Sequence, residues 1–286
     1  MGVENKMESK MEVITMSICT ACPNNCVGCY AENTGNFMTF NDFQKIVKKL
    51  PKTVKQFIIL GGEPFLNKEL KLMLQYLVKK RKIKANILTS GVVKANLKHY
   101  KNLINNLFVT IKYPNLIDNE WKGNPNAFRL AKEMINDAKE NEIKVVINWC
   151  VDKENKQYFE KMIELAKGFG IEMDILRFMP YSKDMRPLFM RKKEWNEFCA
   201  VASQYKIARI ASASVKHSYN VCPAGIVNCN IFTNGNVTPC MYDVKDVVGN
   251  LKIENWNVIS QKLREWRENL AGLKGCPVLY DLLKNV

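Results

Sequence analysis

Residues 22–30 of this chain read Cys22-Pro23-Asn24-Asn25-Cys26-Val27-Gly28-Cys29-Tyr30. The run places three cysteines on one short segment with Cys-x3-Cys-x2-Cys spacing. Three thiolates on a tight loop can bind three irons of a cubane 4Fe–4S cluster and leave the fourth iron open to a small molecule. An open metal position is typical of a reactive site rather than a structural one.

Zinc is the alternative metal for this segment. Cys19 and Cys22 form one Cys-x2-Cys pair and Cys26 and Cys29 form a second, but only three residues separate the two pairs. Structural zinc sites usually need about a dozen or more residues between pairs, so that the chain can fold back around the metal. The spacing therefore favours an iron–sulfur cluster.

The composition is that of an ordinary globular protein. The 286 residues are 47% apolar and 25% charged. No apolar run is long enough to span a membrane, and the polar start of the chain lacks a signal-peptide core. We therefore expect a cytoplasmic protein without membrane partners, in which the ten cysteines are metal or redox ligands rather than disulfides.

The formal net charge of +15 is the one unusual total. The densest basic run, residues 79–84, falls where a helix is expected to end, and cations at a helix C-terminus complement its dipole. A solvated helix end is therefore favoured over a nucleic-acid patch, while an anionic substrate remains compatible with the charge.

Segments with strand and helix periodicity alternate through the first two thirds of the chain. The predicted strands are 13–18, 56–60, 86–89, 107–111, 144–151 and 171–178, and the predicted helices are 41–50, 66–78, a segment reaching about 104, 126–139 and 158–167. Six β–α units imply a parallel sheet with helices outside. We predict an α/β fold, a partial (β/α)6 TIM-like barrel over residues 1–190. A small cysteine-rich α+β domain follows over residues 191–286, beginning with a helix near 192–205.

Two motifs after successive strands resemble a known family. Cys22-x3-Cys26-x2-Cys29 follows the first predicted strand, and Gly61-Gly62-Glu63-Pro64 follows the second. In this order they resemble the radical S-adenosylmethionine (SAM) enzymes. The resemblance implies that the three cysteines bind a 4Fe–4S cluster whose open iron is chelated by SAM, and that Gly61, Gly62, Glu63 and Pro64 bind the amino end of SAM. Two glycines allow close backbone approach, and a carboxylate can accept from an ammonium.

Three other polar residues match the family more loosely. Ser90 ends the third strand and Asn148 lies on the fifth, and the resemblance implies that both contact SAM; Arg177, on the sixth strand, could meet a carboxylate. Ordinary polar residues at strand ends are the alternative. Gly28 departs from the family, which usually has an aromatic residue at this position.

The tail resembles the SPASM and twitch extensions that hold auxiliary iron–sulfur clusters. The resemblance is carried by four cysteines, Cys222, Cys229, Cys240 and Cys276, with Gly235 and Gly249 among them. Four thiolates suffice for one fully ligated 4Fe–4S cluster, so we predict two clusters in all and the one-cluster twitch version of the domain. Unligated buried thiols are the alternative.

Cys150 and Lys112 are the candidate catalytic residues. Side chains alternate along a strand, so Cys150 shares a face with Asn148. If that face lines the barrel lumen, the thiol could return a hydrogen atom to a substrate radical. Lys112 shares a face with Thr110 and could hold an anionic substrate group. Packing is the alternative role for both.

The resemblance implies that the reduced cluster cleaves SAM to methionine and a 5′-deoxyadenosyl radical, which abstracts hydrogen from the substrate. An electron donor such as flavodoxin or ferredoxin is the implied partner. A peptide or protein side chain is the favoured substrate because many enzymes with such tails modify one, although the stretch before Val13 is too short for a separate leader-recognition domain. Oxidation or epimerisation of a small molecule, such as a sugar or nucleotide derivative, comes second, and RNA modification third. A non-enzymatic iron–sulfur electron carrier is a further alternative. The Gly61–Pro64 motif argues against it, because an electron carrier does not need a SAM-binding site.

Overall fold

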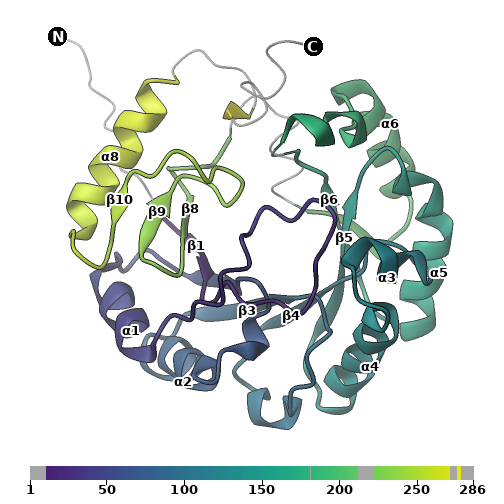
Figure 1. Ribbon diagram of the computed structural model, residues 1–286, viewed down its shortest axis with the longest axis horizontal. Helices are drawn as coiled ribbons and strands as arrows, with labels where there is room; N and C mark the ends of the chain where they lie inside the picture. The colour runs from purple at the N-terminus through teal and green to yellow at the C-terminus, as the bar shows by residue number, and fades with distance from the viewer. Residues whose placement is uncertain (1–10, 181, 212–221, 271–275, 278–286) are drawn as a thin grey trace.

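A single curved sheet forms the centre of the protein, as the computed structural model shows for residues 11–180, 182–211, 222–270 and 276–277 (Figure 1). Its ten strands follow the order β10-β9-β8-β1-β2-β3-β4-β5-β6-β7. Because β10 and β7 are edges rather than neighbours, the barrel is incomplete. The predicted α/β partial barrel is confirmed.

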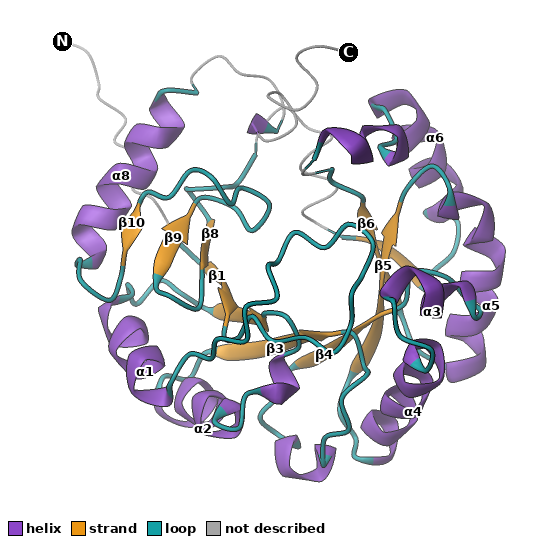
Figure 2. Cartoon of the chain, in the orientation of Figure 1, coloured by secondary structure: helices purple, strands orange, loops and turns teal. Residues whose placement is uncertain are grey.

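The first seven strands run parallel in sequence order. They are β1 (Val13–Ser17), β2 (Gln56–Leu60), β3 (Lys84–Thr89), β4 (Asn106–Thr110), β5 (Val145–Val151), β6 (Met173–Arg177) and β7 (Ala208–Ile210). All six predicted strands are present, within one or two residues at each end. Parallel strands need crossover connections, and these place helices on the outer face of the sheet (Figure 2).

The outer helices are amphipathic and cover the sheet with their apolar faces. They are α1 (Phe40–Lys49), α2 (Leu70–Gln75), α4 (Ala127–Glu140), α5 (Phe159–Phe169) and α6 (Lys192–Ala202). On α4, for example, Phe128, Ala131, Met134, Ile135 and Ala138 are buried. The main hydrophobic core therefore lies between the sheet and these helices.

Two predicted helices differ from the structure. The segment expected to be helical up to residue 104 contains only a 3-10 turn, Leu97–Tyr100. Asn102 adopts a left-handed backbone conformation with φ of 65°, which a right-handed helix cannot contain. The helix expected at 66–78 is divided into a 3-10 turn (Pro64–Leu66), α2 and a π-helical turn (Tyr76–Lys80).

The tail continues the same sheet. Strand β8 (Asn228–Ile231) pairs parallel with β1, and β9 (Asn236–Thr238) and β10 (Gly249–Asn250) follow antiparallel. Helix α8 (Trp256–Glu268) lies outside these strands (Figure 1). The predicted domain boundary at residue 190 therefore does not coincide with a break in the sheet.

No helix among the described residues is long and apolar enough to cross a membrane.

Candidate functional site

The cysteine loop follows β1 at the carboxyl end of the parallel strands. The backbone N–H of Cys29 donates to the carbonyl of Cys26 over 3.2 Å, and Gly28 between them has φ of 75°. A positive φ at the third residue of a four-residue turn defines type II and favours glycine. The departure of Gly28 from the family pattern therefore has a local cause, because the turn that presents Cys26 and Cys29 needs glycine there.

Helix α3 (Ile117–Lys122), which the sequence analysis missed, supports this loop. The carbonyls of Lys122 and Trp121 accept hydrogen bonds from the N–H groups of Asn25 and Val27, at 2.9 and 2.8 Å. On the other side, the Asn33 side-chain amide accepts a hydrogen bond from the Cys22 N–H and donates one to the Cys22 carbonyl. Backbone contacts therefore position the loop.

Two thiols of the loop, Cys22 and Cys26, have raised pKa values. Burial raises the pKa of Cys26 to about 12, and the neighbouring Cys29 and Cys22 thiols add to the shift. Burial also raises the pKa of Cys22, with a smaller contribution from Cys29. Binding to a metal lowers the pKa of a thiol, so an iron–sulfur cluster would hold these cysteines as thiolates although burial raises their pKa in its absence.

Within the described ranges, no three acidic, histidine or cysteine side chains converge tightly enough to hold a single metal ion. A cubane cluster makes a different demand, because each thiolate binds a separate corner. A short loop that carries three free cysteines, two of them half-buried and Cys29 exposed, fits such a cluster.

Gly61 and Gly62 bring the end of β2 against the start of the cysteine loop. A Cβ atom on Gly61 would lie 2.4 Å from the carbonyl oxygen of Cys19, and one on Gly62 would lie 2.3 Å from that of Ala21. The N–H groups of Gly62 and Glu63 donate to the same two carbonyls. Both glycines are therefore required by contact between two backbone segments, in addition to any role toward SAM. The Cys19 thiol is buried here and donates to the Glu63 carbonyl.

The Glu63 carboxylate joins the ends of β2 and β3. It is 0% exposed and accepts from the hydroxyls of Thr89 (2.7 Å) and Ser90 (2.6 Å) and from the N–H groups of Ser90 and Phe65. Burial raises the pKa of Glu63, and these hydrogen bonds oppose the rise. Because a carboxylate accepts about four hydrogen bonds, an ammonium at Glu63 would replace one of these partners.

Lys122 is a buried cation next to the loop that the sequence analysis did not identify. Its ammonium lies 2.8 Å from the Asp118 carboxylate and donates to the Thr110 carbonyl at 2.7 Å. Its positive charge lowers the pKa values of Cys22 and Cys26, against the larger effect of burial. The sequence did contain one indication of this ion pair, because Asp118 and Lys122 are four residues apart and would lie on the same face of a helix.

Asn148 and Cys150 face the lumen. Their neighbours on β5, Ile147, Trp149 and Val151, belong to the outer core, so alternation points Asn148 and Cys150 inward. The Asn148 amide donates to the Thr110 hydroxyl at 3.3 Å, and the Cys150 residue is half-buried. The structure thus places Cys150 on the face where the sequence analysis expected it.

Lys112 forms a buried ion pair. Its ammonium contacts the Asp152 carboxylate and donates to the Cys150 carbonyl at 3.1 Å, and both charged side chains are 1% exposed. A substrate anion at Lys112 would compete with Asp152. The sequence analysis did not identify Asp152. This residue directly follows β5, and side-chain alternation continued by one residue places it on the same face as Cys150.

Arg177 is directed away from the lumen. It shares a face with the core residues Met173 and Ile175, and its guanidinium donates to the Met190 carbonyl. The Phe189 ring lies 4.2 Å from the guanidinium carbon. The structure therefore does not bring Arg177 together with Glu63, Ser90 and Asn148.

The four tail cysteines separate into two groups. Cys222 and Cys240 lie outside the strands; burial raises the pKa of Cys240 to about 12, with smaller contributions from the thiols of Cys276 and Cys222. Cys229 is buried in the main hydrophobic core.

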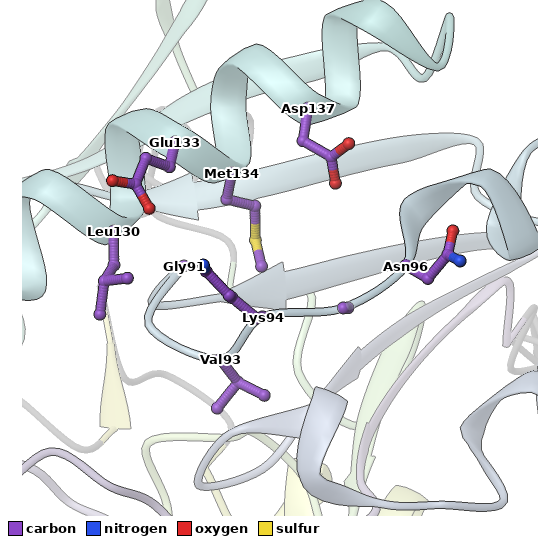
Figure 3. Close-up of a pocket in the computed structure, with 9 residues that line it drawn as sticks. Gly91, Val93, Lys94, Asn96, Leu130, Glu133, Met134 and Asp137 are labelled. Atoms are coloured by element: carbon purple, nitrogen blue, oxygen red, sulfur yellow. The ribbon is translucent and has the colours of Figure 1, made fainter.

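A cavity of about 340 Å³ lies on the outer side of the sheet, between the segment 91–96 and α4 (Figure 3). Its lining residues are Gly91, Val93, Lys94, Ala95, Asn96, Leu130, Glu133, Met134 and Asp137. None of the residues predicted to bind a cluster or SAM lines this cavity.

Fold and site together define an α/β partial barrel with a thiol-rich loop at the carboxyl ends of its strands. Residues 16–166 match the radical SAM superfamily, and the chain belongs to that family. Membership implies a 4Fe–4S cluster and SAM as cofactors. A comparison with curated protein sequences gave no match.

Solved structures share the fold across nearly the whole chain. Streptococcus suis SuiB aligns with a TM-score of 0.66 and 17% identity over 90% of this chain and 66% of SuiB. The chain thus spans slightly less than two thirds of SuiB. Native anSMEcpe with bound AdoMet aligns with a TM-score of 0.71 and 15% identity, over 89% of this chain and 82% of anSMEcpe. SuiB has also been solved bound to precursor peptide SuiA, and anSMEcpe with bound AdoMet and Cp18Cys peptide.

Proposed function

We propose that this radical SAM enzyme abstracts hydrogen from a peptide or protein side chain and so begins its post-translational modification. The observation that carries the proposal is that SuiB and anSMEcpe, each solved with a peptide, align with this chain through its tail as well as its barrel. The tail strands β8–β10 join the barrel sheet, so they form part of the same wall.

Cys22, Cys26 and Cys29 would hold the cluster, and SAM would lie at the carboxyl ends of β2, β3 and β5. When bound, the cluster and SAM supply the radical. Gly61 and Gly62 hold β2 against the cysteine loop, and Glu63 fixes Ser90 beside it. Thr110 and Asn148 are polar groups of the lumen available to orient SAM or substrate.

Cys150 is the proposed hydrogen-atom donor to a substrate radical, and the Lys112–Asp152 pair adjoins it. Burial raises the pKa of Cys150, which keeps the thiol protonated at neutral pH. A protonated thiol carries the hydrogen atom that such a step requires; the transfer leaves a thiyl radical on Cys150, which one electron from the proposed electron donor and a proton from solvent would return to the thiol. The second, auxiliary cluster of the tail is included in the proposal, as is an electron donor such as flavodoxin or ferredoxin.

The test is anaerobic turnover with a short peptide encoded next to the gene. The reconstituted protein, SAM and reductant are incubated with the peptide deuterated at its side chains. We expect deuterium in 5′-deoxyadenosine and a peptide changed at the same residue, detected by mass spectrometry. Deuterium transfer only from a sugar or nucleotide derivative would contradict the peptide assignment and favour the small-molecule alternative.

Cys150→Ala tests the thiol, with Cys199→Ala as the matched control on α6. If Cys150 donates hydrogen, Cys150→Ala still forms 5′-deoxyadenosine but gives a product lacking the solvent-derived hydrogen that the unaltered protein adds. An unchanged product from Cys150→Ala would remove Cys150 from the mechanism.

A further inference from the structure

The cysteines predicted to bind the auxiliary cluster do not lie on one face of the sheet. Cys229 is on β8, where its Cα pairs with that of Ile14 on β1, and its residue is 0% exposed. It belongs to the same outer core as Ile231 of β8 and Ile259 and Leu263 of α8. Alternation then points Asn230, not Cys229, toward the lumen.

Moving the Cys229 thiol to the other face would require a shift of β8 by one residue. Such a shift would also turn Ile231 out of the core and Asn230 into it, because every side chain of a slipped strand changes face. The pairing of four successive β8 residues with β1 opposes this change. The prediction that Cys229 is a cluster ligand therefore conflicts with its position.

The other three cysteines lie beyond the strand ends. Cys222 precedes β8 and Cys240 follows β9, and the distal Cys276 packs with Met179, Phe189 and Tyr242, the last of which lies two residues after Cys240.

Tyr242 connects this group to the reactive end of the barrel. Its ring lies 6.1 Å from the ring of Tyr30, which directly follows the loop cysteine Cys29. Tyr242 also packs with Cys276. Tyr242 thus connects Cys276 with the end of the barrel that carries the cysteine loop.

We propose that Cys222, Cys240 and Cys276 alone hold the auxiliary cluster, and that its fourth iron takes an oxygen or nitrogen ligand in place of a thiolate. Three thiolates leave one corner of a cubane open. This inference rests on the auxiliary cluster of the proposed function. The ligand has two possible sources. One is the carboxylate of Asp243, a buried residue whose backbone N–H donates to the Cys240 carbonyl at 3.1 Å; the other is a molecule entering from the lumen.

The test uses a full-length background, Cys22→Ala/Cys26→Ala/Cys29→Ala, in which all bound iron belongs to the tail. After anaerobic reconstitution, we expect about four irons per chain in this background, about four after adding Cys229→Val, and almost none after adding Cys240→Ala. Loss of iron from the Cys229→Val protein with its circular dichroism unchanged would overturn the proposal. Absence of iron from the background itself would overturn it too.

Mössbauer spectra of the background protein give a second measurement that needs no change in the core. One iron in four should differ from the others, and four equivalent irons would contradict a three-cysteine centre. Asp243→Asn then separates the sources: a changed signal from the distinct iron assigns the ligand to Asp243, and an unchanged one assigns it to an added molecule. SAM cleavage and peptide modification depend on the intact Cys22 loop, so their failure would leave these iron counts unaffected.

Discussion

Contacts of individual residues explain why the cysteine loop keeps its shape. Its motif cysteines and the Gly61-Gly62-Glu63-Pro64 run were predictable from sequence, because both are contiguous. Lys122, Asp118 and Asp152 were not identified, since their importance comes from burial and from partners on other elements. The resemblance implies that Glu63 binds the amino end of SAM, and only the structure adds the four hydrogen bonds that its carboxylate accepts from the protein itself.

Gly61→Ala and Gly62→Ala should each destabilise the protein by about 2 kcal/mol or more, because the new Cβ would meet loop backbone at 2.4 or 2.3 Å. The free energy of unfolding of each variant is measured by urea denaturation monitored by circular dichroism. Gly168→Ala on α5 is the matched control: a Cβ added there would have no atom within 4 Å, so we expect a gain of about 0.5–1 kcal/mol. Equal effects at all three positions would refute the backbone-contact explanation.

Lys122→Met should cost about 3 kcal/mol of unfolding free energy, because it leaves the Asp118 carboxylate buried without its cation. The double variant Lys122→Met/Asp118→Asn should recover most of this loss, since the amide oxygen can still accept from the N–H of Lys112. Denaturant titration of both variants provides the check. A double variant less stable than Lys122→Met would show that the ion pair is not the cause.

Among the secondary-structure elements, the parallel strands were the most predictable, because each is a short apolar run with clear ends. The short helix α3 and the 3-10 turn at Leu97–Tyr100 were not predictable, since neither buries a long periodic face. Strand β8 pairs with β1, more than two hundred residues away in sequence, and no local pattern indicates such a pairing.

The N-terminus of α6 should respond to pH through Glu194. Its carboxylate accepts from the Arg191 N–H at 2.8 Å, and this hydrogen bond lowers the pKa of Glu194 below its ordinary value of 4.5. The folded-state pKa is lowered, so the stabilisation is present above pH 4.5 and is lost as the pH falls below that value. Because the side chain is partly exposed, the effect should be only about 0.3–0.5 kcal/mol.

We therefore expect the stability difference between the unaltered protein and Glu194→Gln to shrink toward zero between neutral pH and about pH 3. Glu197→Gln, an exposed position later on the same helix, is the control. A difference that stays constant across this range would show that the charge of Glu194 does not act at the helix start.

For the whole molecule, the fold and family confirm a radical SAM barrel whose tail continues the sheet. The fold class was predictable from six alternating β–α units. The union of barrel and tail in one sheet was not, and it is this union that places Tyr242 of the tail beside Tyr30 of the cysteine loop.

Reductive cleavage of SAM tests the central claim most directly. The anaerobically reconstituted protein, given SAM and a reductant, should release 5′-deoxyadenosine and methionine, measured by liquid chromatography. Cys22→Ala should abolish the release, and Cys240→Ala should retain part of it. Fully reconstituted protein that binds iron at the Cys22 loop yet forms no 5′-deoxyadenosine above the reductant-free control would contradict the account.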